Sequence, residues 1–147
     1  MAHVRKTIRD NIVTTLTGLT TTGARVFPTR FYPLADAKVP SLCVYTNSEG
    51  TEYSTLTRPR TEVRTLEVMV EAYVKATDDL DDTLDTIAVE VEEALATDVT
   101  RGGNAKDTQV VSFESTYAAE GDQPVGVGRF TVEVLYATLE NDVETAV

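Results

Sequence analysis

The sequence predicts an α+β fold: one mixed, mainly antiparallel sheet of four to five strands, two helices packed on one face, and a long β-hairpin loop. Residues 61–75 alternate between apolar and amphiphilic side chains, which is the period of a strand with one buried face. Residues 3–19 and 78–97 instead repeat apolar residues every three or four positions, as amphipathic helices do. The elements follow the order helix, strand, strand, long loop, strand, helix, strand, strand, which is typical of an α+β layer.

The length and composition are those of one globular domain. A chain of 147 residues can bury a substantial core, and we expect residues 1–147 to form a single domain. Hydrophobic residues make up 41% and charged residues 25% of the chain, an ordinary mixture. No apolar run approaches the length of a membrane span, and the N-terminus lacks the pattern of a signal peptide. We therefore expect a protein made in the cytoplasm without a membrane partner.

The chain is strongly acidic. Its net charge is −11, from 24 acidic and 13 basic residues. Contacts with phosphates need a basic surface, so this balance argues against sequence-specific binding of nucleic acid. An acidic wall can still let DNA pass without holding it. The simpler interpretation is that the acidic residues keep the protein soluble.

The first third of the chain predicts a helix and two strands. Gly23 ends the helix at 3–19, because glycine readily adopts a left-handed turn. Residues 25–32 predict a short strand, and Pro28 restricts it to a sheet edge because proline cannot donate to a ladder. Residues 41–46 are apolar on both faces and predict a central strand. The apolar stripe of the helix consists of Val4, Ile8, Ile12, Leu16 and Leu19.

Residues 47–60 form a long polar stretch that we interpret as a loop between two strands. Loops of this length are uncommon inside a domain and tend to be functional or disordered. Two interpretations stay open: a plain mobile hairpin loop, or a contact loop that becomes ordered against a partner or a neighbouring subunit. The candidate contact residues are Tyr53 and Leu56 as anchors, and Arg58 and Arg60 for acidic partners.

The second helix, at 78–97, begins among carboxylates, which favour the positive end of a helix dipole. Thr77 or Asp78 can cap it. Its apolar stripe consists of Leu80, Leu84, Ile87, Val91, Ala94 and Leu95.

Two further strands are predicted over 108–117 and 125–136, with a turn at 120–124 between them. Gly126 and Gly128 indicate a bulge or a close approach of another chain segment. The tail at 141–147 is expected to be flexible. The apolar anchors expected on the first of these strands are Val111 and Phe113.

The sequence contains no recognisable active site. His3 is the only histidine, so a histidine triad and a multi-histidine metal site are excluded. Residues 78–82 are rich in aspartate but lack the glycine and the closing glutamate of a calcium loop. Cys43 lies in an apolar run, which predicts a small buried side chain rather than a nucleophile. We expect a protein that is not an enzyme and uses no metal or cofactor.

One layer of helices can cover only one face of the sheet. The opposite face is expected to carry Met69 and Tyr73 from one strand and Arg129 and Leu135 from another, among several carboxylates. Antiparallel sheets can show such a face to water. The mixture of tyrosine, methionine and arginine also suits a subunit interface, and a ring of neighbouring sheets would protect strand edges. These residues therefore favour a homo-oligomer, with a solvated face as the alternative.

Six short strings follow one another in a fixed order. They are Thr-Gly-Ala at 22–24, Pro-Ser-Leu-Cys-Val-Tyr at 40–45, Glu-Gly-Thr-Glu-Tyr at 49–53, Leu-Glu-Val-Met-Val at 66–70, Leu-Asp-Asp-Thr-Leu-Asp at 80–85, and Phe-Thr-Val-Glu-Val-Leu-Tyr at 130–136. In this order, and over nearly the whole chain, the sequence resembles the tail terminator proteins of long-tailed phages, the family of the phage lambda minor tail protein U. Residues 100–106 depart from the family, because this segment is longer and richer in glycine.

The resemblance implies a structural protein of the virion, placed in the tail at the head–tail junction. Such proteins form a hexameric ring on the head-proximal end of the tail tube, stop its polymerisation and present the surface that joins the head. The implied partners are further copies in a homohexamer, the tail tube protein and a head-completion or neck protein, with DNA passing through the ring. Two alternatives stay open: another phage neck protein, such as a head-completion or stopper component, and a non-viral small-ligand-binding or regulatory domain.

Overall fold

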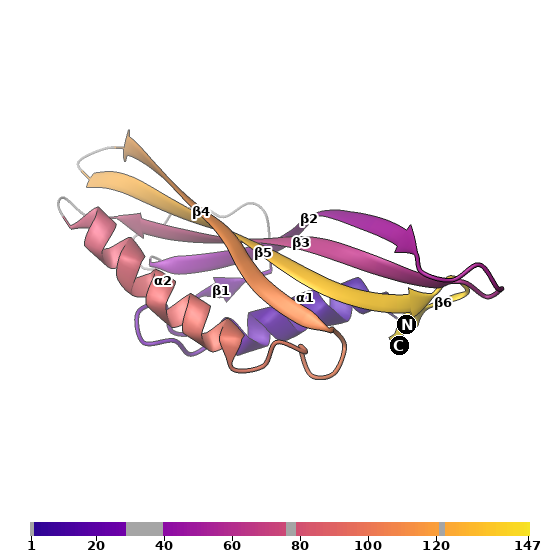
Figure 1. Cartoon of the computed structure of the whole chain (residues 1–147). Coiled ribbons are helices and arrows are strands. Elements are labelled where there is room, and N and C mark those ends of the chain that lie inside the picture. The colour runs from indigo at the N-terminus through magenta and orange to yellow at the C-terminus, as the bar shows by residue number, and fades with distance from the viewer. Residues whose placement is uncertain (1, 29–39, 76–78, 121–122) are drawn as a thin grey trace.

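A six-stranded, mostly antiparallel sheet carries two helices on one face in the computed structural model of the chain (Figure 1). The structure describes residues 2–28, 40–75, 79–120 and 123–147. The predicted α+β class is confirmed, with six strands rather than four to five. The elements are α1 (Val4–Leu16), β1 (Val26–Phe27), β2 (Ser41–Tyr53), β3 (Thr61–Lys75), α2 (Leu80–Ala96), β4 (Asp107–Glu120), β5 (Gln123–Leu139) and β6 (Asp142–Ala146).

The strands lie in the order β1-β2-β3-β5-β4, and β6 also pairs with β5. Among the strand pairs of the described residues, only the short contact between β1 and β2 is parallel. The central strand β3 has the predicted bounds of 61–75 and pairs with β5 along its whole length, from Thr61 opposite Leu139 to Lys75 opposite Val125. Its regular alternation therefore sets the two faces of the sheet.

Helix α1 starts at Val4 and ends at Leu16, which is shorter than the predicted 3–19. His3 is the N-cap, and its Nδ1 accepts a hydrogen bond from the backbone N–H of Arg5 at 3.1 Å. Leu19 falls beyond the helix, in a short bridge to Gly23, which has the expected positive φ of 57°. The buried face of α1 consists of Val4, Ile8, Ile12 and Leu16.

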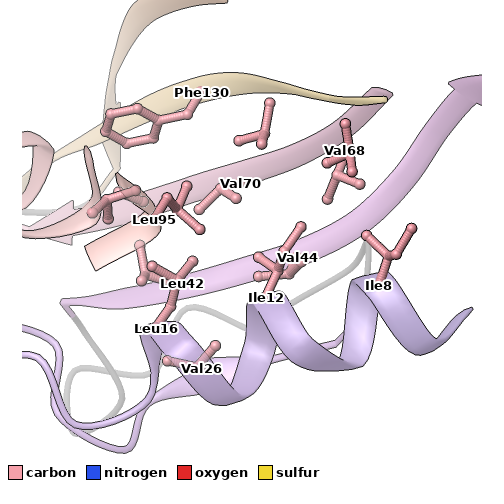
Figure 2. Packing of buried hydrophobic residues seen from close by; sticks show 14 of the residues in the cluster. Ile8, Ile12, Leu16, Val26, Leu42, Val44, Val68, Val70, Leu95 and Phe130 are labelled. Carbon is pink, nitrogen blue, oxygen red and sulfur yellow. The ribbon is translucent and has the colours of Figure 1, made fainter. Parts of the chain in front are cut away.

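The core lies between the helices and one face of β2, β3 and β5. Figure 2 shows Ile8, Ile12 and Leu16 of α1 next to Leu42 and Val44 of β2. Each fully buried aliphatic or aromatic side chain stabilises the fold by about 1.5–3 kcal/mol relative to exposure. The central strands contribute Leu66, Val68, Val70, Ala72, Val74, Phe130, Val132, Val134 and Tyr136, and α2 contributes Leu84, Ile87, Val91 and Leu95.

Helix α2 also keeps its predicted apolar stripe, but not its predicted cap. Thr77 and Asp78 lie outside the described residues. The N-cap position is occupied by Asp79, which has a left-handed backbone (φ 51°) and makes no capping hydrogen bond with its side chain. Asp81 and Asp82 in the first turn still favour the positive end of the helix dipole.

The prediction of a loop over 47–60 is wrong in its first half. Strand β2 continues to Tyr53 and pairs with β3 as far as Glu62, so only residues 54–60 connect the two strands. A β-bulge between Thr46 and Ser48 shifts the alternation of side chains by one position. Because of this shift and the polar composition, the second half of the strand has no recognisable strand pattern in the sequence.

The prediction of a flexible tail at 141–147 is also wrong. Strand β6 pairs with the end of β5, with Thr138 opposite Ala146. The backbone N–H of Val147 donates to the carbonyl oxygen of Ala137 at 2.9 Å. Ala146 packs against the core, so the tail completes the sheet rather than leaving it.

Strand β4 is longer than the predicted 108–117, and of its two predicted anchors Val111 is wrong, whereas Phe113 packs against the core residue Phe130. A bulge follows Val110, which packs against the core, and leaves Val111 46% exposed. Phe113 is 40% exposed, although its ring lies 5.0 Å from that of Phe130. The residue inserted at the bulge therefore breaks the expected alternation.

The remaining boundaries differ by a few residues. Strand β5 extends beyond the predicted 125–136 at both ends. Strand β1 lies at a sheet edge, as Pro28 predicts, but the residues of 25–32 from position 29 onward lie outside the described chain. Residues 121–122 of the predicted turn at 120–124 also lie outside it.

Gly128 shows the close approach that the sequence predicts, without a bulge between β5 and β3. A Cβ atom built on Gly128 would lie 2.9 Å from Cε1 of Phe113 and 3.1 Å from Cδ2 of Leu84. The missing side chain lets α2 and the ring of Phe113 pack directly on the backbone of β5.

We expect Gly128→Val to lower the free energy of unfolding by about 1–3 kcal/mol, because the added methyl groups overpack this site. The measurement is urea unfolding. Gly50→Val is the matched control: Gly50 is also in a strand, but nothing lies within 4 Å of its Cβ position. Equal stability of the two variants would contradict the prediction.

Candidate functional site

The four residues predicted for the open sheet face all lie on the face opposite the helices. Arg129 lies opposite Glu71 in the register of β3 and β5, between the positions of Met69 and Tyr73. Leu135 lies opposite Thr65, eight residues along β3 from Tyr73 (73 − 65), or roughly 27 Å at about 3.4 Å per residue. The structure therefore brings Met69, Tyr73 and Arg129 together and leaves Leu135 apart.

An ion pair holds the centre of this face together. Nη2 and Nε of Arg129 lie 2.7 and 2.8 Å from Oε2 of Glu71. The hydroxyl of Tyr73 donates to Oε1 of the same carboxylate at 3.2 Å. The hydrogen bond to Glu71 raises the pKa of Arg129, while burial and then Glu71 raise the pKa of Tyr73. Removing either partner of this buried carboxylate would destabilise the site, because the charge of Glu71 would be less well compensated.

The exposed part of this face lies away from that centre. Met69 and Glu71 are only 6% and 4% exposed, whereas Leu135 is 37% exposed. The outermost strand, β4, is exposed at every position from 111 to 117. Contacts with a partner are therefore available at the border of the sheet rather than at its middle. The large apolar side chains exposed on β4 are Val111, Phe113 and Tyr117, of which Phe113 and Tyr117 lie on the side of the helices.

The predicted loop residues lie at the end of the β2–β3 hairpin, which extends past the start of α1 (Figure 1). Leu56 is 94% exposed and lies in the connection between the strands. Arg58 precedes Pro59, and the peptide bond between them is cis. The guanidinium of Arg60 lies 4.9 Å from the centre of the Tyr53 ring, a cation–π contact. Arg60 thus has an internal partner, while Leu56 is the most exposed of the described large hydrophobic residues.

A buried polar network at the base of this hairpin was not predicted from the sequence. The carboxylate of Glu49 accepts hydrogen bonds from Nη1 of Arg5 at 2.5 Å and Nη1 of Arg64 at 2.9 Å, and from the hydroxyl of Tyr136. Arg64 also pairs with Glu62. The network joins α1, β2, β3 and β5.

The electrostatics of the network follow from burial and pairing. Burial, and then the hydrogen bond to Glu49, raise the pKa of Tyr136 above its ordinary value. Burial acts to lower the pKa of Arg64, but the hydrogen bond to Glu49 and the charges of Tyr136, Glu49 and Glu62 together outweigh this effect and raise it. Glu62 and Arg64 share the parity of Leu66 in β3, so charges in phase with the core were the signal for this network in the sequence.

The other candidate groups have structural surroundings. Cys43 has no exposed surface, and burial raises the pKa of its thiol to about 11. Burial lowers the pKa of His3, which caps α1. The groove beside α2, about 410 Å³, is lined by carboxylates, and the hydroxyl of Tyr117 donates to Asp81 there. The side chains that line this groove can make non-covalent contacts with a partner.

The described residues contain no group of three or more histidine, cysteine, aspartate or glutamate side chains placed to hold a metal ion. Within the same ranges, neither helix has the length and apolar character needed to cross a membrane.

No protein-family model matches the chain, and no curated protein matches it in sequence.

We expect Glu49→Gln to lower the free energy of unfolding by about 3 kcal/mol, because it leaves two arginines without their shared carboxylate in a buried site. Thermal and urea unfolding measure this effect. Asp10→Asn is the control, since the ion pair of Asp10 with Lys6 is exposed and contributes less than about 1 kcal/mol. A loss for Glu49→Gln as small as that of the control would show that the network does not stabilise the hairpin.

Proposed function

We propose that the protein is a structural phage tail terminator. It forms a ring that caps the head-proximal end of the tail tube, stops polymerisation of the tube and provides the surface that joins the head. The observation that carries this proposal is the ordered series of strings over nearly the whole chain. Within the described residues, four of these strings lie inside regular elements: 49–53 in β2, 66–70 in β3, 80–85 in α2 and 130–136 in β5.

The β2–β3 hairpin supports a contact with the tube. Its paired strands hold the connection at 54–60 at one end of the molecule, where Leu56 is almost fully exposed (Figure 1). A rigid hairpin loses less conformational entropy on binding than a mobile loop of the same length would. This replaces the expectation that most of residues 47–60 become ordered only in the complex.

The acidic surface supports passage of DNA without binding. Helix α2 has no basic residue, and Asp82, Asp85, Glu92 and Glu93 are exposed on it. Like charges repel a DNA backbone at short range, so a channel with such walls would not retain it. The same surface would keep the free protein soluble.

The test is electron microscopy of the purified protein, alone and mixed with tail tubes. A tail terminator gives rings of six copies on one end of each tube, and tubes capped in this way do not elongate. Rings that bind portal complexes but not tubes would identify a stopper or head-completion component instead. Monomers that bind neither, but melt at a higher temperature with a small ligand, would identify a ligand-binding domain.

We expect Leu56→Ser to reduce the affinity for tail tubes about tenfold or more, because an exposed apolar anchor at an interface centre contributes over 1 kcal/mol. Its melting temperature should match that of the parent protein, since Leu56 packs against little. Val89→Ser on α2 is the control, because Val89 is also an exposed apolar residue. Normal tube capping by the Leu56→Ser variant would remove the hairpin from the proposed contact.

A further inference from the structure

The sheet has two open edges within the described residues. The outer edge of β4 has no partner strand anywhere from Asp107 to Glu120. On the opposite border, β1 pairs with β2 only at Leu42 and Cys43, and no described strand pairs with the outer edge of residues 47–53. Open edges present unpaired N–H and C=O groups that can form a ladder with another chain.

The β4 edge has little of the usual protection against such pairing. Native edges are commonly blocked by lysine, proline or short strand length. Strand β4 has 14 residues and contains no lysine, arginine or proline. Its single bulge, after Val110, leaves the longer part of the strand regular. The edge is therefore suited to a partner strand.

The directions of the two edges are compatible with each other. Each neighbouring pair from β2 through β3 and β5 to β4 is antiparallel, so β4 runs opposite to β2. A second copy placed beside the first in the same orientation would pair β4 antiparallel with β2. The register runs from Ser48 through Glu67 and Glu133 to Gln109, so Ser48 and Gln109 lie at the same level.

The helices next to the two edges carry opposite charge. On the β4 side, Glu92 of α2 lines a groove with Thr108 and Val110. We call Glu92 the acidic flank. Because both helices cover the same face, this flank would meet the neighbour's α1 when two edges join.

The neighbour's α1 is basic on the side that faces β2. Nη1 of Arg9 donates to Oγ1 of Thr46 at 3.0 Å, and Arg5 pairs with Glu49. We call Arg5 and Arg9 the basic flank. Arg9 and Glu92 lie near the same level of the sheet, because Thr46 corresponds to Val110 in the register. Complementary charge of this kind selects the correct partner and fixes its position.

We propose that the start of β4, residues 107–109, in one copy pairs antiparallel with residues 48–50 of β2 in the next copy, so that the sheets of neighbouring copies form one continuous wall. The contact joins two different surfaces, which is the type that forms a ring when the rotation between copies closes and a filament when it does not. The acidic flank of one copy lies against the basic flank of the next. The inference deepens the proposed function and rests on it only for closure of the ring.

The first test is cross-linking of a double variant, Ser48→Cys with Gln109→Cys, by a short bis-maleimide. Both positions are exposed and lie on the open face, while Cys43 is buried and does not compete. We expect a ladder of covalent oligomers from the double variant at high concentration or on tubes. The controls are the two single variants, which should give none.

The other outcomes contradict the proposal. Dimers from Gln109→Cys alone would mean that two β4 edges pair with each other in a closed dimer. Absence of cross-links in the double variant, both in concentrated solution and on capped tubes, would contradict the proposal. An extended segment of a different protein would then be the candidate partner of β4. Rings on tubes without these cross-links reject the inference and keep the proposed function. Cross-linked ladders that do not cap tubes keep the inference and reject the proposed function.

The second test exchanges the charges. Arg9→Glu and Glu92→Lys should each weaken self-association roughly two- to fivefold per contact, as expected for an exposed ion pair. Mixing the two variants should restore it, because alternating copies regain opposite charges at every contact. Glu93→Lys is the control, since Glu93 is exposed but does not line the groove beside β4. Light scattering measures the association, and a mixture no tighter than its components rejects the charge pairing.

Discussion

The pairing of β3 with β5 determines most of this structure. Apolar residues of both strands face the helices at matching positions, as Val68 and Val132 do. A shift of one residue would turn every such side chain to the other face, so burial fixes the register. The helices then have only one surface to cover, and β2 and β4 have only one place to pair. The open face and the two open edges follow from this pairing.

Beyond the helices, the face of the sheet that they cover carries charged residues instead of apolar ones. At the base of the hairpin, positions in phase with the core hold Glu62 and Arg64, and Glu49 reaches them from β2. Ion pairs with several hydrogen bonds pack against the sheet there. Such a network adds little stability compared with an apolar core, but the loss of one partner is costly, so it requires one arrangement of its members. It therefore specifies the direction of the hairpin relative to α1.

The regular parts of the fold were predictable from the sequence and the irregular parts were not. The bounds of β3 follow from an alternation without interruption, and the stripe of α1 from its period. The bulges after Thr46 and Val110 add a residue and reverse the faces, which hid part of β2 and misplaced Val111. The candidate residues on the open face were assigned correctly to that face. Their separation and the buried state of Met69 depend on tertiary packing, which no local pattern contains.

The two bulges lie at the same level of the sheet, since Thr46 and Val110 correspond in the register. At that level the strands on either side of β3 and β5 each contain one more residue than the inner pair. A surface that is longer along its margins than along its midline cannot be flat, and it takes the shape of a saddle. The extra residue in each outer strand therefore requires the sheet to curve. This requirement does not depend on the helices or on the surroundings.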